Sequence, residues 1–300
     1  MGCTALFYVG CEEADQSGPG EIANRIYEVR GVVQEIRKDG DVLVIDHEEI
    51  PGFMRQMIMP FKVAKEEPRV PLIPGDEIEF VYEVADVKSW IYRIRKTGVS
   101  KEVKLGSADD IPDPEDVPVL TIGDELPDYH FRNQDGKAVS LHQFRGMPLA
   151  LTFVFTRCPV PDYCPAMMRN FDEVEEILKS DPAAPDQWKL LSVSFDSWHD
   201  NPETMKAYGL AFGRDSEKWG LLSTDDCCTI NEISGNVGLK FADKDGSFVH
   251  NLRTVVLDRE GRITRIFTDE DWKVPDLVAE LKRLGKTGDS RDIAKPAESN

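Results

Sequence analysis

The sequence predicts a small all-β barrel followed by a larger α/β domain with a mixed sheet. Short alternating segments rich in Val, Ile, Tyr and Phe occupy the first third of the 300-residue chain. In the remainder, continuous apolar segments alternate with amphipathic ones, which is typical of buried strands and covering helices. An acidic, Pro-rich stretch without periodicity separates the two patterns, as a linker between domains does.

The first domain, residues 23–100, is predicted to be all β. Its alternating segments are separated by Gly and Pro, and they lie at 27–36, 41–46, 76–84 and 90–97. Several short strands in so short a stretch favour a closed barrel, because closure removes exposed strand edges. Residues 101–117 are the predicted linker.

The second domain, residues 118–286, is predicted to place helices around a mixed sheet. Buried strands are expected at 147–156 and 188–196, and a hairpin at 253–268 that turns at Glu260-Gly261. The amphipathic segments predict helices at 165–180, 201–213, 229–241 and 274–285. Strand–helix alternation followed by an antiparallel hairpin indicates an α/β fold. Residues 287–300 are expected to be a disordered tail.

The charge balance argues against a nucleic-acid partner. The formal net charge is −19, from 36 basic and 55 acidic residues. Binding of phosphate backbones needs clustered Lys and Arg, which this composition does not favour. No apolar segment reaches the roughly 20 residues that a membrane-spanning helix needs.

The first residues, MGCTALFYVGCEE, resemble the end of a bacterial lipoprotein signal with Cys11 as the lipidated residue. No Lys or Arg precedes the short apolar run, so the start of a longer signal is expected to lie upstream. We therefore expect residues 1–22 to be leader and linker of an exported protein, periplasmic or held at the membrane only by a lipid on Cys11. The alternative is a frayed N-terminus with an incidental cysteine.

The segment FTRCPVPDYCP, residues 155–165, is the most specific chemical signal. Cys158 follows the first buried strand, at the edge where ligands gather in α/β sheets. Cys164 precedes a helix, whose N-terminal dipole favours a thiolate. Two thiolates on one loop suit Cu(I), and they could also close a disulfide. Of the five histidines, His250 is best placed to add a third ligand, although spacing alone leaves a structural role open.

A second soft-metal pattern lies at residues 44–63, VIDHEEIPGFMRQMIMPFKV. Met57 and Met59 are two residues apart, so they face the same side of a strand. Met54 lies just before them, and His47 closes the preceding strand. Thioethers with an imidazole form a neutral donor set that prefers Cu(I). Core packing is the alternative, because methionine commonly fills gaps in cores.

The motifs FTRCP, SVSFD, NPETMKAYG and TVVLDREGRI make residues 118–284 similar to the Sco family of copper chaperones. That resemblance implies a thioredoxin-like fold and a role in delivering copper to cytochrome c oxidase, or in reducing its cysteines. It also implies that Cys158, Cys164 and His250 bind copper. The family usually has three residues between its cysteines, whereas this chain has five. The resemblance therefore does not predict the angle at which the two sulfurs would hold a copper ion, nor the redox potential of the cysteine pair.

Residues 26–98 resemble the CusF-like periplasmic metallochaperones, which are small OB-like barrels. The resemblance implies that His47, Met57 and Met59 bind Cu(I). The Trp of that family falls near Phe53 or Met54 here, so we expect Met54 to serve as a third thioether or a lid.

Taken together, these patterns predict an exported copper metallochaperone. The barrel would capture Cu(I), and Cys158, Cys164 and His250 would hold Cu(I) or Cu(II) and pass it to a copper-accepting protein such as a cytochrome c oxidase subunit. The absence of Cys-x-x-Cys, and of a Pro before the facing strand, favours a metal carrier over an enzyme. Three alternatives stay open: a thiol-disulfide reductase with Cys158 and Cys164 as its redox pair, a periplasmic copper buffer for resistance, and a metal-free structural pair of domains.

Asp196 and the adjacent cysteines Cys227 and Cys228 are two further features of the second domain. Asp196 is expected near the site, where it either contacts a group beside the ligands or caps a helix. Cys227 and Cys228 are expected in the first turn of a helix capped by Thr224 or Asp225. We expect a buried structural role for this pair, with an auxiliary redox or copper role as the alternative.

Overall fold

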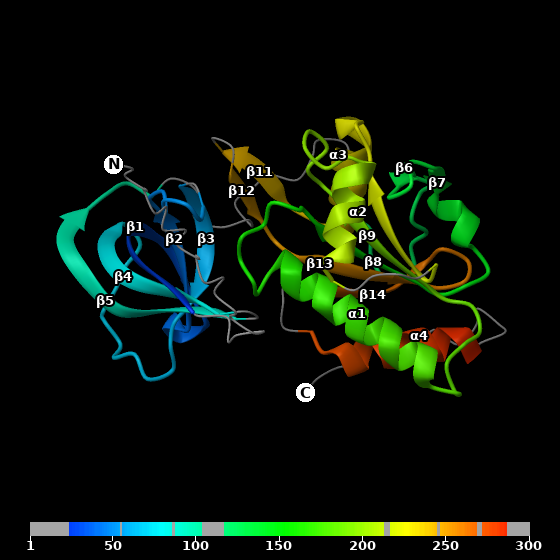
Figure 1. Ribbon diagram of the computed structural model, residues 1–300, viewed down its shortest axis with the longest axis horizontal. Helices are drawn as coiled ribbons and strands as arrows, with labels where there is room; N and C mark the ends of the chain where they lie inside the picture. The colour runs from blue at the N-terminus through cyan, green and yellow to red at the C-terminus, as the bar shows by residue number, and fades with distance from the viewer. Residues whose placement is uncertain are drawn as a thin grey trace, which may run out of the picture.

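The computed structural model describes residues 24–54, 56–85, 88–103, 117–212, 217–244, 247–268 and 272–286. It contains two large sheets, one in each half of the chain (Figure 1). We call residues 24–103 the N-terminal domain and residues 117–286 the C-terminal domain. The expected leader, most of the linker and the expected tail lie outside the described residues and stay predictions. In the part described, no helix is both long enough and apolar enough to cross a membrane.

The N-terminal sheet is antiparallel throughout, with strand order β3-β2-β1-β4-β5. The four predicted strands are present, and the methionine segment supplies the fifth strand. Its strands are β1 (Arg25–Arg37), β2 (Val42–His47), β3 (Met57–Lys62), β4 (Asp76–Val84) and β5 (Ser89–Ser100).

The two edges of this sheet curve towards each other. Val63, just after β3, forms an isolated parallel bridge with Ile91 of β5, and the Ala64 N–H donates to the Ile91 carbonyl at 2.9 Å. Among the described residues, direct pairing between the two edge strands is confined to this bridge. The strands therefore form a curved, OB-like antiparallel sheet, and its two edges are hydrogen-bonded to each other only near Val63 and Ile91 in the part of the chain described.

The C-terminal sheet is mixed, with strand order β14-β13-β8-β9-β10-β6-β7. β8, β9 and β10 run parallel, while the strands on either side of them are antiparallel. The strands are β6 (His130–Asn133), β7 (Ala138–Ser140), β8 (Leu149–Val154), β9 (Lys189–Ser194), β10 (Trp219–Ser223), β13 (Arg253–Leu257) and β14 (Ile263–Thr268). A separate pair, β11 (Phe241–Lys244) and β12 (Ser247–His250), forms a small hairpin.

Helices cover both faces of this sheet, which explains why the central strands are apolar along their length. In the view of Figure 1, α1 (Cys164–Ser180) and α4 (Val274–Lys286) lie below the sheet. On the other side lie α2 (Pro202–Leu210) and α3 (Cys227–Val237). All six residues of β8 are buried, which fits its place in the middle of the sheet. The predicted thioredoxin-like, mixed-sheet α/β class is confirmed.

Some boundaries differ from the prediction. α3 ends at Val237 rather than 241, because Gly238 follows in the left-handed conformation at φ +67 and stops the helix. The chain then enters β11 at Phe241. The predicted hairpin is present, with Gly261 at φ +84 in its turn. The strands β6, β7, β10, β11 and β12 were not anticipated.

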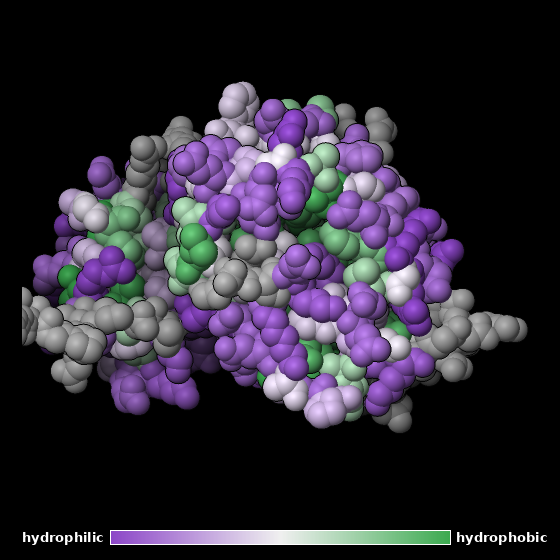
Figure 2. All heavy atoms as spheres, turned by 45° about the vertical axis from the view of Figure 1, so that its right-hand side comes forward, coloured by the Kyte–Doolittle hydropathy of each residue, from purple (hydrophilic) through white to green (hydrophobic). Residues whose placement is uncertain are grey.

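The surface agrees with the acidic composition. The face shown in Figure 2 is mainly hydrophilic, with smaller hydrophobic patches between the polar side chains. A mainly hydrophilic face with scattered apolar side chains is usual for a folded protein whose larger apolar side chains are buried.

Candidate metal centres

The cysteine loop leaves β8 and is held in place by two buried carboxylates. Asp200 accepts hydrogen bonds from the Thr156 N–H at 2.9 Å and from the Thr156 hydroxyl at 2.5 Å. Asp196 accepts two from the Arg157 guanidinium, at 3.1 and 2.6 Å. Both carboxylates therefore fix the two residues that precede Cys158. The N-cap of α2 is Asn201, so the capping role expected for Asp196 is wrong. The contact of Asp196 with Arg157 agrees with the alternative, and an influence of Asp196 on a metal stays a prediction.

Cys158 and Cys164 are both buried, and neither forms a disulfide. Burial opposes the Cys158 thiolate, but hydrogen bonds from the Cys164 thiol and from the backbone at Val160 and Cys164 outweigh it and lower the pKa of Cys158. Burial and the neighbouring Cys158 sulfur raise the pKa of Cys164 well above its usual value. Cys158 is therefore the more acidic of the two thiols.

His250 lies over this loop at the end of β12. Its ring centroid is 5.5 Å from Phe155, 5.2 Å from Phe195 and 6.4 Å from Tyr163. Nδ1 lies 2.8 Å from the Asn251 carbonyl oxygen. A carbonyl oxygen only accepts, so Nδ1 carries the proton and Nε2 keeps its lone pair. Burial lowers the pKa of His250, which favours the neutral ring that a metal requires.

The three predicted ligands of this site are brought to one region but are not drawn tightly together. Among the described residues, two groups of His, Cys, Asp or Glu place three ligand atoms within 4.8 Å of one another, and neither is this trio. One is Asp196, His199 and Asp200, whose carboxylates already bind the cysteine loop. The other is Asp226 with Cys227 and Cys228, on the surface. Binding of one ion by Cys158, Cys164 and His250 therefore requires His250 and the loop to approach each other.

His47 has the same arrangement in the N-terminal domain. Its Nδ1 lies 2.7 Å from the Glu48 carbonyl oxygen, so Nδ1 is again the donor. Nε2 is buried and, among the described residues, has no hydrogen-bond partner. Burial lowers the pKa of His47 to about 4, so the ring is neutral at physiological pH. A buried imidazole nitrogen without a partner is costly unless something binds it. This fits a metal ligand.

Thioethers lie beside His47. Met57 pairs with His47 in the β2–β3 register, and Met59 pairs with Ile45 two residues away, so these side chains share one face of the sheet. Met59 and Met54 are buried, and Met57 is partly buried. The donor set is soft and neutral, as Cu(I) prefers. Phe61, also on this face, packs edge-on to the His47 ring at 5.5 Å.

Gly31 of β1 is the neighbour of His47 on its other side. A Cβ at this position would lie 2.4 Å from Ile45 Cγ2, 2.9 Å from the Asp46 carbonyl oxygen and 3.0 Å from His47 Cα. Only glycine therefore lets β1 approach the strand that carries His47 this closely. The sequence analysis did not single out this residue, although a glycine inside a strand pattern is a signal of close backbone approach.

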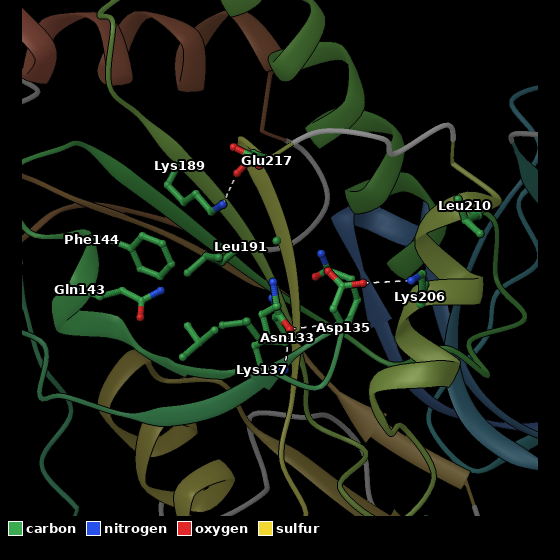
Figure 3. A pocket seen from close by; sticks show the side chains of 14 residues that line it. Asn133, Asp135, Lys137, Gln143, Phe144, Lys189, Leu191, Lys206, Leu210 and Glu217 are labelled. Atoms are coloured by element: carbon green, nitrogen blue, oxygen red, sulfur yellow. Dashed lines mark hydrogen bonds and ion pairs between the residues drawn. The ribbon is translucent and has the colours of Figure 1, made fainter.

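A pocket of about 460 Å³ lies away from both centres, at the β6–β7 edge of the C-terminal sheet. Figure 3 shows charged side chains around it, including Asp135 paired with Lys206 at 3.0 Å. Its lining, which belongs wholly to the described residues, includes no Cys, His or Met. It is therefore not a soft-metal site.

The second cysteine pair differs from the expectation of burial. Cys227 and Cys228 are exposed, and Asp226 caps the helix that they begin. The prediction of a first-turn position is confirmed, while the buried structural role is wrong. Met167 and Met168, which follow the cysteine loop, are fully buried in α1 and belong to the core.

A thioredoxin-like sheet with two thiols at the end of a central strand and an imidazole above them defines a class of proteins for soft metals or thiol chemistry. Residues 122–286, more than half of the chain, match the family model described as SCO1/SenC. The chain belongs to the SCO1/SenC family. Residues 26–96 match the model described as copper binding periplasmic protein CusF, so the N-terminal domain is CusF-like.

Individual relatives align mainly with part of the chain. The SCO1 protein homolog of Bacillus subtilis (strain 168) is 23% identical over 162 residues, which are 53% of this chain and 81% of that protein. A structure of BsSco, described as a member of the Sco family of cytochrome c oxidase assembly proteins, is 20% identical with a TM-score of 0.49 and covers 56% of this chain and 97% of that one. ScoI of Bradyrhizobium japonicum, solved with copper bound, is 27% identical with a TM-score of 0.44, covering 55% and 99%.

The family assignments confirm both predicted resemblances. They also confirm copper as the metal at the level of the family, because the model that matches the N-terminal domain describes a copper-binding protein. The individual ligands stay predictions.

Proposed function

We propose that this protein is an exported copper metallochaperone with two copper sites. His47, Met57 and Met59, with Met54 nearby, bind Cu(I) in the N-terminal domain. Cys158, Cys164 and His250 bind copper in the C-terminal domain and deliver it to a cuproprotein such as a cytochrome c oxidase subunit. The assembly role named for BsSco agrees with that recipient.

One observation carries this proposal. Two different folds in one chain each present a histidine whose Nδ1 is engaged by the carbonyl of the next residue, beside sulfur-bearing side chains. Such a contact fixes the tautomer and orients the ring, which is how proteins prepare an imidazole for a metal. In the N-terminal domain the remaining nitrogen is buried without a hydrogen-bond partner, and a soft cation would supply the missing interaction.

Metal analysis of the full chain after loading with Cu(I) tests the proposal. The unaltered protein is expected to retain copper at both sites. The Cys158→Ala/Cys164→Ala variant and the Met57→Leu/Met59→Leu variant are each expected to lose one ion while remaining folded. Unchanged copper content in both variants would exclude these residues as the ligands.

A second candidate function, thiol-disulfide reduction, is favoured by the difference in pKa between Cys158 and Cys164. The lowered pKa of Cys158 beside the raised pKa of Cys164 is the pattern of an attacking thiolate and its resolving thiol. A reductase of oxidase cysteines would reduce insulin disulfides without copper, whereas a carrier would not. A copper buffer for resistance predicts that deletion of the gene leaves oxidase assembly intact.

The proposed location is outside the cytoplasm of a bacterium, in agreement with the periplasmic description of the family that the N-terminal domain matches. A lipid on Cys11 is proposed as the only membrane attachment. Mass analysis of the N-terminal peptide from the membrane fraction tests this. A soluble chain that carries an unmodified Cys11 would rule it out.

A further inference from the structure

The two candidate copper sites lie on neighbouring parts of the two domains. β3, which carries Met57 and Met59, is adjacent to β12, which ends at His250 (Figure 1). Buried side chains of both domains belong to one continuous apolar cluster. The N-terminal domain is therefore packed on the C-terminal domain at the side where the cysteine loop lies.

Asp162, between the two cysteines, makes the polar contacts across this junction. Its Oδ2 accepts hydrogen bonds from the Ser89 N–H at 2.7 Å and from the Ser89 hydroxyl at 2.9 Å. Its Oδ1 accepts one from Lys62 Nζ at 3.2 Å. These donors all belong to the N-terminal domain, and Asp162 is only 9% exposed. A carboxylate at this depth is costly without such partners, so the contacts favour the docked arrangement.

The loop presents Asp162 in a fixed conformation. The Tyr163 N–H donates to the Val160 carbonyl at 3.1 Å, which closes a turn around Asp162. Arg169 Nη2 from α1 donates to the Pro161 carbonyl at 2.7 Å. The segment between the cysteines therefore projects one acidic side chain towards the N-terminal domain, and its ends carry the two thiols.

Tyr82 of β4 belongs to the aromatic cluster beside His47. Its ring is 5.0 Å from Phe61, which in turn contacts His47. Burial raises the pKa of Tyr82. Val84, two residues further along β4, pairs with Ser89, whose N–H donates to Asp162 at 2.7 Å, so this end of β4 lies near the cysteine loop.

We propose that Asp162 is a docking anchor that holds the N-terminal domain over the cysteine pair. In the docked arrangement, other proteins cannot reach the two thiols, and the thioether site lies beside the cysteine site. Separation of the domains exposes the thiols, so that copper can be delivered to another protein. The copper part of this inference rests on the proposed function. Cu(I) moves by exchange of ligands without oxidation or reduction: sulfur and nitrogen bonds of the first site break, bonds to Cys158, Cys164 and His250 form, and every proton that a cysteine thiol releases goes to water.

The docking is tested on the full chain without metal, through the rate at which iodoacetamide alkylates each cysteine, measured by peptide mass spectrometry. In the Asp162→Ala variant, Cys158 is expected to react at least about tenfold faster than in the unaltered protein, because opening of the junction becomes easier. Exposed Cys227 should react at the same rate in both and serves as an internal reference. Equal rates at Cys158 would overturn the proposal.

Matched variants separate docking from general loss of stability. Asp135→Ala removes an ion pair of similar length, to Lys206 within the C-terminal domain, and should leave the rate at Cys158 unchanged. Asp162→Asn keeps an acceptor for Ser89 and loses the charge that Lys62 contacts, so an intermediate rate is expected. An increase with Asp135→Ala equal to that with Asp162→Ala would overturn the anchor role.

Small-angle X-ray scattering supplies a second readout. Asp162→Ala should increase the radius of gyration at unchanged helix content, and an unchanged radius would exclude domain separation. None of these measurements uses copper. If the chain binds no copper while Asp162→Ala exposes Cys158, the proposed function fails and the docking stands. If copper binds normally while the thiols of all variants react alike, the docking fails and the proposed function stands.

Discussion

His47 and His250 belong to different folds, yet each ring directs Nδ1 to the carbonyl oxygen of the following residue. The sulfur donors beside them differ. Neutral thioethers accompany His47, whereas two cysteine side chains accompany His250, and the pKa of Cys158 among them is lowered. A neutral set holds a monovalent soft ion without adding charge, while a thiolate adds Coulomb attraction. The two histidines therefore have the same backbone contact, and the two regions differ in the type of sulfur beside the ring. On the proposed function, this difference in sulfur predicts tighter Cu(I) binding at the C-terminal site.

The largest effect on Cu(I) affinity is expected from replacing Cys158. Cys158→Ser should weaken Cu(I) binding at the C-terminal site by more than about 100-fold, since even outer partners of a ligand contribute about 10–100-fold. Competition with a Cu(I)-specific chelator measures this in the full chain. Cys227→Ser is the matched control and should change nothing. Equal affinity of the unaltered and Cys158→Ser proteins would remove the thiolate from the explanation.

A smaller effect is expected from the thioethers. Met57→Leu should weaken Cu(I) binding at the N-terminal site by about tenfold, which corresponds to about 1.4 kcal/mol, and leave the C-terminal site unchanged. Leu and Met have similar volumes, so the fold should be retained. Met167→Leu in the core of α1 is the control. If Met57→Leu binds as tightly as the original, the side chain only fills space.

A third variant tests whether the fold itself prepares His47. Gly31→Ala forces a methyl group against Ile45 and the backbone at residues 46 and 47, so the free energy of unfolding of the N-terminal domain should fall by about 1–3 kcal/mol. Chemical denaturation followed by circular dichroism measures this, with Glu28→Ala on the exposed face of β1 as control. A variant of unchanged stability would show that β1 and β2 can move apart without cost.

The smallest effect is expected for the surface cysteines. Cys227→Ser/Cys228→Ser should change the free energy of unfolding by less than about 0.5 kcal/mol and leave both copper affinities intact, because both side chains are exposed. The same denaturation and chelator experiments apply. Loss of copper from this variant would place a third site at the start of α3.

Long periodic segments were predictable from the sequence. The strands of the N-terminal sheet, the buried strands β8 and β9, the helices α1 and α4 and the β13–β14 hairpin all have patterns that extend over several residues. The strands β6, β7, β11 and β12 have only three or four residues each, too few for a period to show. β10, WGLLS, is fully buried, and a short apolar run of this kind does not distinguish a strand from a helix.

The ligand types were also predictable, because Cys, Met and His are rare enough to stand out. The contacts that position them were not. Asp200 lies 44 residues from Thr156, and Asp162 lies 73 residues from Ser89, so no local pattern relates these pairs. The predicted burial of Cys227 and Cys228 was wrong because the first turn of α3 faces solvent. Which side of a helix turn faces solvent depends on how the helix packs in the fold, and the local sequence does not determine it.

The contrast between the two cysteine pairs has a practical consequence. Among the four cysteines of the described residues, a maleimide dye, added briefly in slight excess, should modify the pair at the start of α3 first and spare the sulfurs of the buried loop. The molecule thus offers a natural attachment point for a fluorophore or a surface tether. An assay meant to follow the thiols of the buried loop will also count the α3 pair unless that pair is blocked or replaced.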